Sequence, residues 1–255
     1  MVADRPGKAG SKRRIRLQDR DEAILRDHVA RFRMTTYAVL HRMYWPNDTL
    51  NAVKSWVRRM SAGNLLTSAP LHGRTLYFHA TPHAAKLLSL DPRVAEPRKA
   101  AYLATTFGHL AFCCLGKSTR RKLSVDDFKT KFPELVLPRD ANDGYYIDRT
   151  IHRELPVPER QRLGFIFVDD ARSLRRIPVV LTRLISRRLR IPSWKSDLIG
   201  NGSFVIAIVT ATDGKRNAIQ QALGGLHPDV LFQVTSCPDL RNVVHERRSR
   251  FAAGP

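Results

Sequence analysis

The segment from Thr49 to Ala80 predicts a helix followed by two short strands, and it limits the fold of this chain more than any other stretch. Four apolar residues recur at helical spacing and predict one buried helix face: Leu50, Val53, Val57 and Met60. Gly63, followed by Asn64, predicts the end of this helix. Thr49 is of a residue type that caps helix N-termini, so we expect the helix to begin there.

Two strand-like runs follow this helix. Leu65 and Leu66 begin the first run, and residues 75–78 form the second, with a turn at His72-Gly73-Arg74. A helix with a basic outer face and a hairpin with an arginine at its tip are typical of a winged helix-turn-helix. In that fold the helix enters the major groove of DNA, and the wing contacts the backbone or the minor groove.

Two helices are predicted ahead of this segment. The first runs from Leu17 to Phe32 and has Asp19 or Asp21 as its cap. The second is capped by Thr35 or Thr36 and runs through Trp45, before a turn at residues 46–48. Two helices, a turn, a basic helix and a hairpin follow the order of a winged helix-turn-helix, so we expect this fold for residues 17–92.

The charge of the chain indicates an anionic partner. The sequence has 44 Lys and Arg against 23 Asp and Glu, a formal net charge of +21. Nucleic acid is the leading candidate, because each neutralised phosphate releases counterions, and an anionic membrane surface is the other. The sequence contains no apolar run of about 18 residues that would span a bilayer. We therefore expect double-stranded DNA as the partner, no membrane, and a cytoplasmic location associated with the nucleoid or a plasmid.

The expected DNA contacts lie on the basic helix, on the wing, and on a basic, disordered tail formed by residues 1–16. Asn51 and Ser55 are expected to face base edges, and the basic residues to hold mostly phosphates. The full predicted set is Arg13, Arg14, Thr36, Asn51, Lys54, Ser55, Arg58, Arg59 and Arg74. The alternative is that the basic residues form a solvated helix face and the tail is a solvated terminus.

The second half of the chain predicts an α/β domain. Strand-like runs fall at residues 145–147, 163–168, 204–209 and 230–234, and helices are expected at 174–189, 213–223 and 238–244. Their alternation predicts a partly parallel sheet. A helix rich in Ala, Leu and Phe at residues 99–115 is expected to connect the halves or to form a dimer contact. The expected division is a connector at 93–120, an α/β domain at 121–246 and a frayed C-terminus at 247–255.

One constellation in this half resembles a catalytic site. Asp143 precedes a strand, with Asp140 as the alternative first acid, and the next long strand ends in Asp169-Asp170-Ala171-Arg172. This is the outline of a PD-(D/E)xK nuclease site, in which the acids hold a divalent ion and a lysine assists the reaction. Arg172 stands at the lysine position and cannot act as a base, because arginine stays protonated. The alternative is that Asp169 and Asp170 cap a loop and the start of a helix. We expect no cofactor, with Mg²⁺ bound only if this site is active.

The chain also resembles a known family. The runs LQDRDEAILRDHVARFRMTTYAVLHRMYW and AVKSWVRRMSAGNLL are similar to the start of the replication-relaxation proteins of bacterial plasmids and integrated mobile elements. The runs DGYYID and GFIFVDDARS are similar to a nuclease-like C-terminal region, which resembles the restriction-endonuclease-like fold. The resemblance implies a winged-helix DNA-binding protein associated with replication, relaxation or mobilisation.

Three functions follow as hypotheses. The leading one is a non-enzymatic, homodimeric protein that binds double-stranded DNA of a plasmid or mobile element, with other plasmid-processing proteins as further partners. The second is a metal-dependent DNA endonuclease that uses Asp143, Asp169 and Asp170. The third is a transcriptional repressor whose α/β half senses a ligand or forms a dimer.

Overall fold

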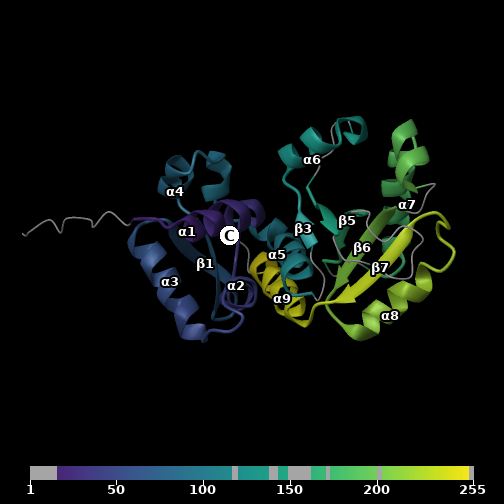
Figure 1. Ribbon diagram of the computed structural model, residues 1–255. Coiled ribbons are helices and arrows are strands. Elements are labelled where there is room, and N and C mark those ends of the chain that lie inside the picture. The colour runs from purple at the N-terminus through teal and green to yellow at the C-terminus, as the bar shows by residue number, and fades with distance from the viewer. Residues whose placement is uncertain are drawn as a thin grey trace, which may run out of the picture.

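The computed structural model describes residues 16–116, 120–137, 143–148, 162–170, 173–199 and 203–252. The predicted mixed α/β class is confirmed, since helices and two β-sheets both contribute to the fold (Figure 1). No helix in these ranges is both long enough and apolar enough to cross a membrane.

The first half consists of helices packed against a two-stranded hairpin. Its helices are α1 (Asp19–Ala23), the helical stretch Ile24–Ala30 that continues α1, α2 (Tyr37–Tyr44), α3 (Leu50–Ala62) and α4 (Pro82–Leu87), followed by a short helical turn at Pro92–Ala95. The hairpin consists of β1 (Leu66–His72) and β2 (Thr75–Ala80), which pair antiparallel from Leu66 and Ala80 to His72 and Thr75. Thr35, between the first two helices, adds a single antiparallel bridge to Phe78 of β2.

The core of this half explains where α3 lies. Val53, Val57 and Met60 are buried as predicted, and Trp56 is buried beside them. Leu50 was expected in this buried set, but its side chain is 43 % exposed. Leu50 is the first residue of α3, where the helix end leaves its side chain open to solvent, and Trp56 joins the buried set instead.

The second half is built on a five-stranded sheet in the order β3 (Arg120–Lys122), β4 (Tyr145–Asp148), β5 (Arg162–Val168), β6 (Phe204–Thr210) and β7 (Leu231–Ser236). The pairs β3–β4 and β4–β5 are antiparallel, and the pairs β5–β6 and β6–β7 are parallel. The sheet is therefore partly parallel, as predicted. Its helices are α5 (Ala100–Cys114), α6 (Val125–Lys131), α7 (Arg176–Arg188), α8 (Asp213–Ala222) and α9 (Pro238–Ala252), with short helical stretches at Pro133–Leu135 and Trp194–Ile199.

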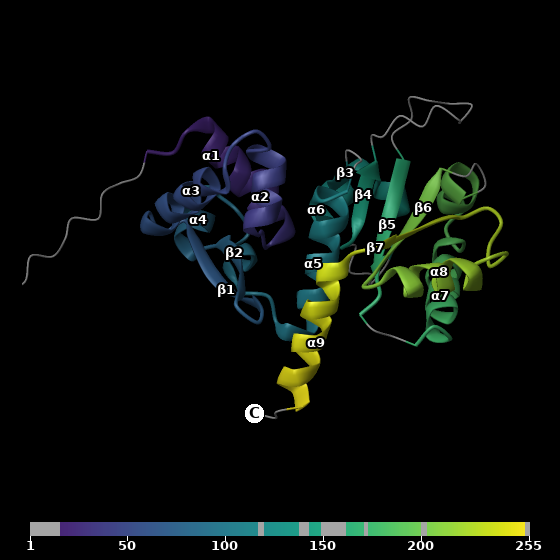
Figure 2. The ribbon, with the colours of Figure 1, turned by 90° about the horizontal axis from the view of Figure 1, so that it is seen from below.

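Side chains of β6 alternate between two apolar layers, which is the reason for its uninterrupted hydrophobic sequence. Ile206 and Ile208 pack in one layer with residues of α7 and α8. Ala207 and Val209 pack in the other layer with residues of α5 and α9. Helices cover both faces of the sheet, as Figure 2 shows, so the whole of β6 is buried.

The two halves share a core along α5. Most of this helix is buried, and its apolar cluster includes Leu71 and Tyr77 of the hairpin as well as Leu240 and Val243 of α9. The side of α5 is also closely fitted to the sheet, since a Cβ atom on Gly108 would lie 2.7 Å from Val168 Cγ1. The helix expected to connect the halves is thus packed between the hairpin and the sheet.

Two element boundaries differ from the expectation. β3 was not predicted, because it has three residues, all of them basic, and no apolar alternation. α9 was expected to end at residue 244 but runs to Ala252, so the helix enters the segment expected to fray.

Candidate nucleic-acid interface

Helix α3 presents one polar face outward. Four residues turn inward and are buried: Val53, Trp56, Val57 and Met60. Four others are exposed on the outward side: Asn51, Lys54, Ser55 and Arg58. Their spacing of three and four residues places them on one stripe of the helix, so the structure brings these predicted contacts together. Leu50 joins this exposed side at the start of the helix.

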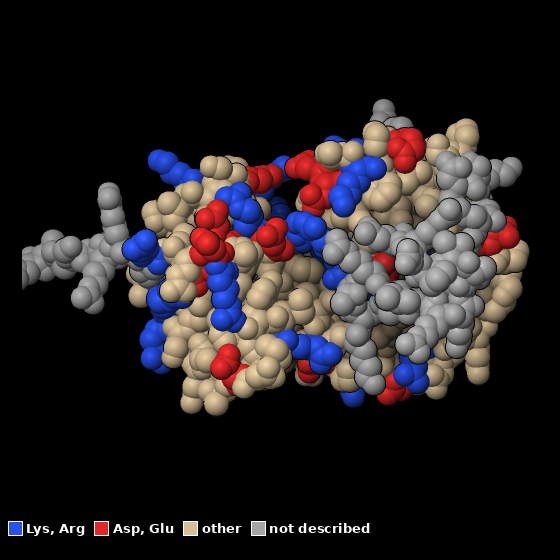
Figure 3. Space-filling model, in the orientation of Figure 1, with Lys and Arg blue, Asp and Glu red and all other residues tan. Residues whose placement is uncertain are grey.

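Among the described residues, the two cations of this face, Lys54 and Arg58, have no protein partner. Within the described ranges, neither Lys54 nor Arg58 makes an ion pair or a side-chain hydrogen bond. Lys and Arg side chains lie along the outer edge of the molecule beside α3 in Figure 3. Unpaired cations on a rigid helix are available to an anionic ligand without first breaking an internal contact.

A buried carboxylate fixes the position of α3. Asp21 of α1 is 2 % exposed, and its Oδ1 accepts hydrogen bonds from Trp56 Nε1 and from Arg59, both at 2.7 Å. Its Oδ2 accepts the backbone N–H of Gln18 at 3.1 Å, which closes the cap of α1. One terminal nitrogen of Arg59, a predicted phosphate contact, therefore ties α3 to α1.

The hairpin tip lies beside the C-terminal helix. Gly73 has a φ of +49°, a conformation that favours glycine, and Arg74 next to it is exposed. The Gly73 backbone N–H lies 3.5 Å from Glu246 Oε2 of α9. Arg74 also lines a groove of about 450 Å³ that reaches Asp239 at the start of α9. The predicted contact Arg74 is thus exposed at the tip, at the border between the two halves.

The remaining predicted contacts lie elsewhere. Thr36 is 8 % exposed, and its hydroxyl accepts the Val39 backbone N–H at 3.3 Å as the cap of α2. Its place is inside the fold rather than on the outward face of α3. Arg13 and Arg14 lie outside the described residues.

Asp143 is held in a cluster of basic side chains at the junction of the halves. Its carboxylate lies 2.5 Å from Lys122 Nζ and 3.8 Å from Arg98. Burial alone would raise the pKa of Asp143, but Lys122, His109 and Arg98 outweigh burial and lower this pKa to about 2. Lys122 Nζ also lies 3.5 Å from the Arg31 carbonyl oxygen, so the cluster joins β3 to the first half.

Asp169 is engaged in a similar way at the end of β5. It is 1 % exposed, and its Oδ2 lies 3.0 Å from the Thr210 hydroxyl and 2.5 Å from Lys215 Nζ of α8. Asp170 follows it and is partly exposed, whereas Arg172 lies outside the described residues.

The two acids belong to the same edge of the sheet. The Ile166 backbone N–H donates to the Gly144 carbonyl at 2.9 Å, so the start of β4 lies against the end of β5. However, each carboxylate already has a lysine counter-ion, and no three His, Cys, Asp or Glu side chains in the described part of the chain are placed to hold a metal ion. Both acids of the nuclease outline are thus engaged with lysine side chains.

Sequence reasoning missed the lysine partners of Asp143 and Asp169. Lys122 lies 21 positions before Asp143, and Lys215 lies 46 positions after Asp169, so only the fold brings each pair together. The partner of Asp21 had a visible signal, because Trp56 falls on the apolar side of the helical pattern with a polar indole N–H that needs an acceptor.

Comparisons with known proteins give no relative from which a function could be inferred, so the function is argued from the geometry of this interface. No family model matches this chain, and neither the curated proteins nor the solved structures contain a significant match to it.

Proposed function

We propose that the protein binds double-stranded DNA through α3 and the β1–β2 hairpin, in the manner of a winged helix-turn-helix. The order of elements supports this proposal: α1 with its continuation, the single-residue strand at Thr35, α2, α3 and then the hairpin. In this arrangement α3 is the recognition helix and the hairpin is the wing.

The observation that carries the proposal is the outward face of α3. Asn51 and Ser55 are short polar side chains of the kind that hydrogen-bond to base edges. Lys54 and Arg58 flank them with charges that no described side chain neutralises. A helix of 13 residues is about 20 Å long, and the major groove, about 12 Å wide, admits a helix.

A titration with paired variants tests the proposal. Duplexes selected from a random library by the wild-type protein are titrated with Lys54→Ala/Arg58→Ala. A matched control, Arg183→Ala/Arg187→Ala, removes the same charge at the same spacing from exposed positions on α7. We expect the α3 variant to weaken binding at least tenfold, since two phosphate contacts are lost, and the α7 variant to bind like the wild type. Equal affinity of the α3 variant and the wild type would show that α3 does not read DNA.

The biological setting is a further part of this proposal and rests on the family resemblance. The protein acts as a homodimer on a plasmid or mobile element, in replication, relaxation or mobilisation, in the cytoplasm. Selection of bound fragments from a genome that carries such an element tests this setting, because the bound fragments should map to the element. Light scattering of the free protein and of its DNA complex tests the dimer.

A metal-dependent DNA endonuclease is the second candidate. The observation that favours it is the shared sheet edge, where Asp143 at the start of β4 lies close in the fold to the end of β5. The lysine counter-ions of Asp143 and Asp169 argue against it. Incubation with supercoiled plasmid and Mg²⁺ or Mn²⁺ separates the two functions, and we expect no nicking at any protein excess.

A further inference from the structure

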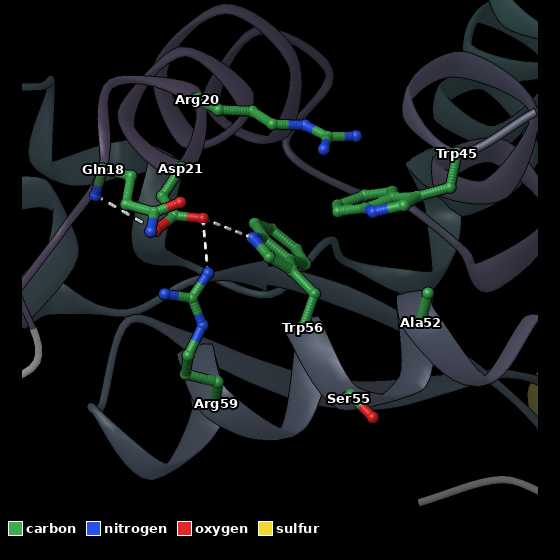
Figure 4. A pocket seen from close by; sticks show the side chains of 8 residues that line it. All are labelled: Gln18, Arg20, Asp21, Trp45, Ala52, Ser55, Trp56 and Arg59. Atoms are coloured by element: carbon green, nitrogen blue, oxygen red, sulfur yellow. Dashed lines mark hydrogen bonds and ion pairs between the residues drawn. The ribbon is translucent and has the colours of Figure 1, made fainter. Parts of the chain in front are cut away.

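A hollow of about 300 Å³ lies between α1 and α3, next to the outward face of α3. Figure 4 shows the side chains that line it: Gln18, Arg20, Asp21, Trp45, Ala52, Ser55, Trp56 and Arg59. Ser55 belongs both to this hollow and to the exposed stripe of α3. A group bound in the hollow would therefore lie beside a ligand that contacts α3.

Arg20 is fixed at one side of the hollow with most of its donors free. Its guanidinium lies 4.3 Å from the centre of the Trp45 ring, and one terminal nitrogen donates to the Tyr44 carbonyl oxygen. In the described part of the chain, Arg20 has no acidic partner. A guanidinium has five N–H donors, so a stacked arginine with one donor engaged keeps the others for an anion.

Arg59 is held on the opposite side by a carboxylate that accepts three hydrogen bonds. Asp21 accepts the Trp56 and Arg59 hydrogen bonds with one oxygen and the Gln18 backbone N–H with the other. The Arg59 side chain is 40 % exposed, and in Figure 4 its guanidinium points to Asp21, with Trp56 beside it. Two guanidinium groups and one carboxylate give the lining a net charge of +1, which matches one singly charged anion.

The lining excludes an apolar or stacking ligand. Trp45 and Trp56 are only 8 % and 5 % exposed, and Arg20 covers the face of Trp45. What remains accessible is the pair of guanidinium groups and the polar edge of α3. Planar guanidinium groups favour phosphate, because their N–H donors match its oxygen atoms.

We infer that this hollow seats one backbone phosphodiester of the DNA strand that borders the groove occupied by α3. The inference rests on the proposed function and adds Arg20 to the interface as a phosphate-binding residue, with Arg59 as its partner across the hollow. The phosphate is held from two helices at once, which fixes how deeply α3 enters the groove and in which register it reads the bases.

The test combines one variant with one change in the DNA. Arg20→Gln removes the charge and keeps a polar side chain, and Arg26→Gln is the matched control on the continuation of α1, where Arg26 pairs with Glu22 at 2.9 Å in solvent. Affinities are measured over a range of salt concentrations. We expect Arg20→Gln to weaken binding about fivefold to tenfold at ~0.1 M salt and to reduce the salt slope by about 0.9, while Arg26→Gln changes neither.

A scan of the DNA with neutral methylphosphonate linkages locates the contacted phosphate without altering the protein. One linkage should weaken the wild type clearly more than it weakens Arg20→Gln, because one of the two guanidinium partners of that phosphate is already absent from the variant. The inference is overturned if Arg20→Gln keeps the wild-type slope, or if every linkage acts equally on both proteins, while Lys54→Ala/Arg58→Ala still loses binding. Failure of the α3 variant to lose binding would instead overturn the proposed function, and the phosphate seat with it.

Discussion

The indole nitrogen of Trp56 lies 2.7 Å from the carboxylate of Asp21, and this hydrogen bond joins the recognition-helix candidate α3 to α1 inside the fold. The same carboxylate binds Arg59, so one buried acid holds two side chains of α3 and fixes how this helix packs against α1. A helix that presents side chains to a ligand must be held rigidly, and this contact supplies that restraint.

Asp21→Ala should therefore destabilise the protein. The change leaves a buried indole N–H without an acceptor and removes the partner of Arg59, so we expect the free energy of unfolding to fall by about 3 kcal/mol. Urea unfolding followed by tryptophan fluorescence measures this loss. Asp21→Asn keeps an acceptor for Trp56 and should lose clearly less; equal losses for the two variants would contradict the role given to the hydrogen bond.

The exposed position of Leu50 gives a second prediction. Met60, on the same helix, is fully buried, so Met60→Ala should lower the free energy of unfolding by about 2–5 kcal/mol. Leu50→Ala removes a side chain that is 43 % exposed and should change it by less than about 1 kcal/mol. Chemical denaturation of both variants measures the two losses. A loss for Leu50→Ala as large as that for Met60→Ala would mean that Leu50 belongs to the buried face of α3, as the sequence pattern indicated.

Burial of His28 predicts a loss of stability in mild acid. Burial lowers the pKa of His28 to about 4, and its Nε2 lies 2.9 Å from the Thr35 hydroxyl. The unfolded chain, with a His pKa near 6.5, then binds a proton before the folded one does as the pH falls. The contribution of His28 is present above pH ~6.5 and is lost between pH ~6.5 and 4, by up to about 3 kcal/mol.

Unfolding free energies measured at intervals from pH 7 to pH 4 check this prediction. His28→Gln keeps a polar side chain that does not titrate, so its stability should fall less steeply over this range than that of the wild type. Parallel pH profiles for the two proteins would contradict it. His109 is also buried with its pKa lowered to about 4, so part of the acid loss should persist in His28→Gln.

Asp143 predicts a separate effect at lower pH. Its pKa of about 2 is below that of the unfolded chain, so its contribution is present above pH ~4 and is lost as the pH falls toward 2. The Asp143 side chain is 39 % exposed, and water screens its ion pairs, so we expect about 1 kcal/mol. Asp143→Asn should remove this step from the acid unfolding curve, which urea unfolding measured between pH 4 and pH 2 would show.

A glycine in the sheet has a packing requirement that can be tested directly. Gly164 of β5 pairs with Tyr146 of β4, and a Cβ atom on Gly164 would overlap the Tyr146 ring. Gly164→Ala should cost about 2 kcal/mol or more of unfolding free energy. Gly214 in α8 has open space where a Cβ would lie, so Gly214→Ala should be neutral or stabilising by up to about 1 kcal/mol. Thermal and urea unfolding of the two variants provide the comparison.

The sequence predicted those elements whose signals are local. Gly63 ends α3 where expected within one residue, and the turn at Gly73 and Arg74 joins two strands as expected. The apolar runs of β5 and β6 identified buried strands, since each faces helices on both sides. Leu50 was misplaced because a residue at the end of a helix can satisfy the helical period and still face solvent.

The tertiary contacts of the candidate site were beyond sequence reasoning. The lysines that neutralise Asp143 and Asp169 come from strand β3 and helix α8, and β3 carries no sequence signal. Arg20 was one basic residue among many until the fold placed it over Trp45. The acids therefore resembled a nuclease site in sequence, whereas the structure gives each of them a basic partner.

The salt dependence of DNA binding tests the central claim most directly. Fluorescence anisotropy gives the affinity of the wild type and of Lys54→Ala/Arg58→Ala for the same selected duplex at several salt concentrations. If α3 lies in the major groove and its two cations hold phosphates, the slope of log K against log salt should be shallower in the variant by about 1.8. Identical affinities and identical slopes for the two proteins would contradict the claim that α3 binds DNA.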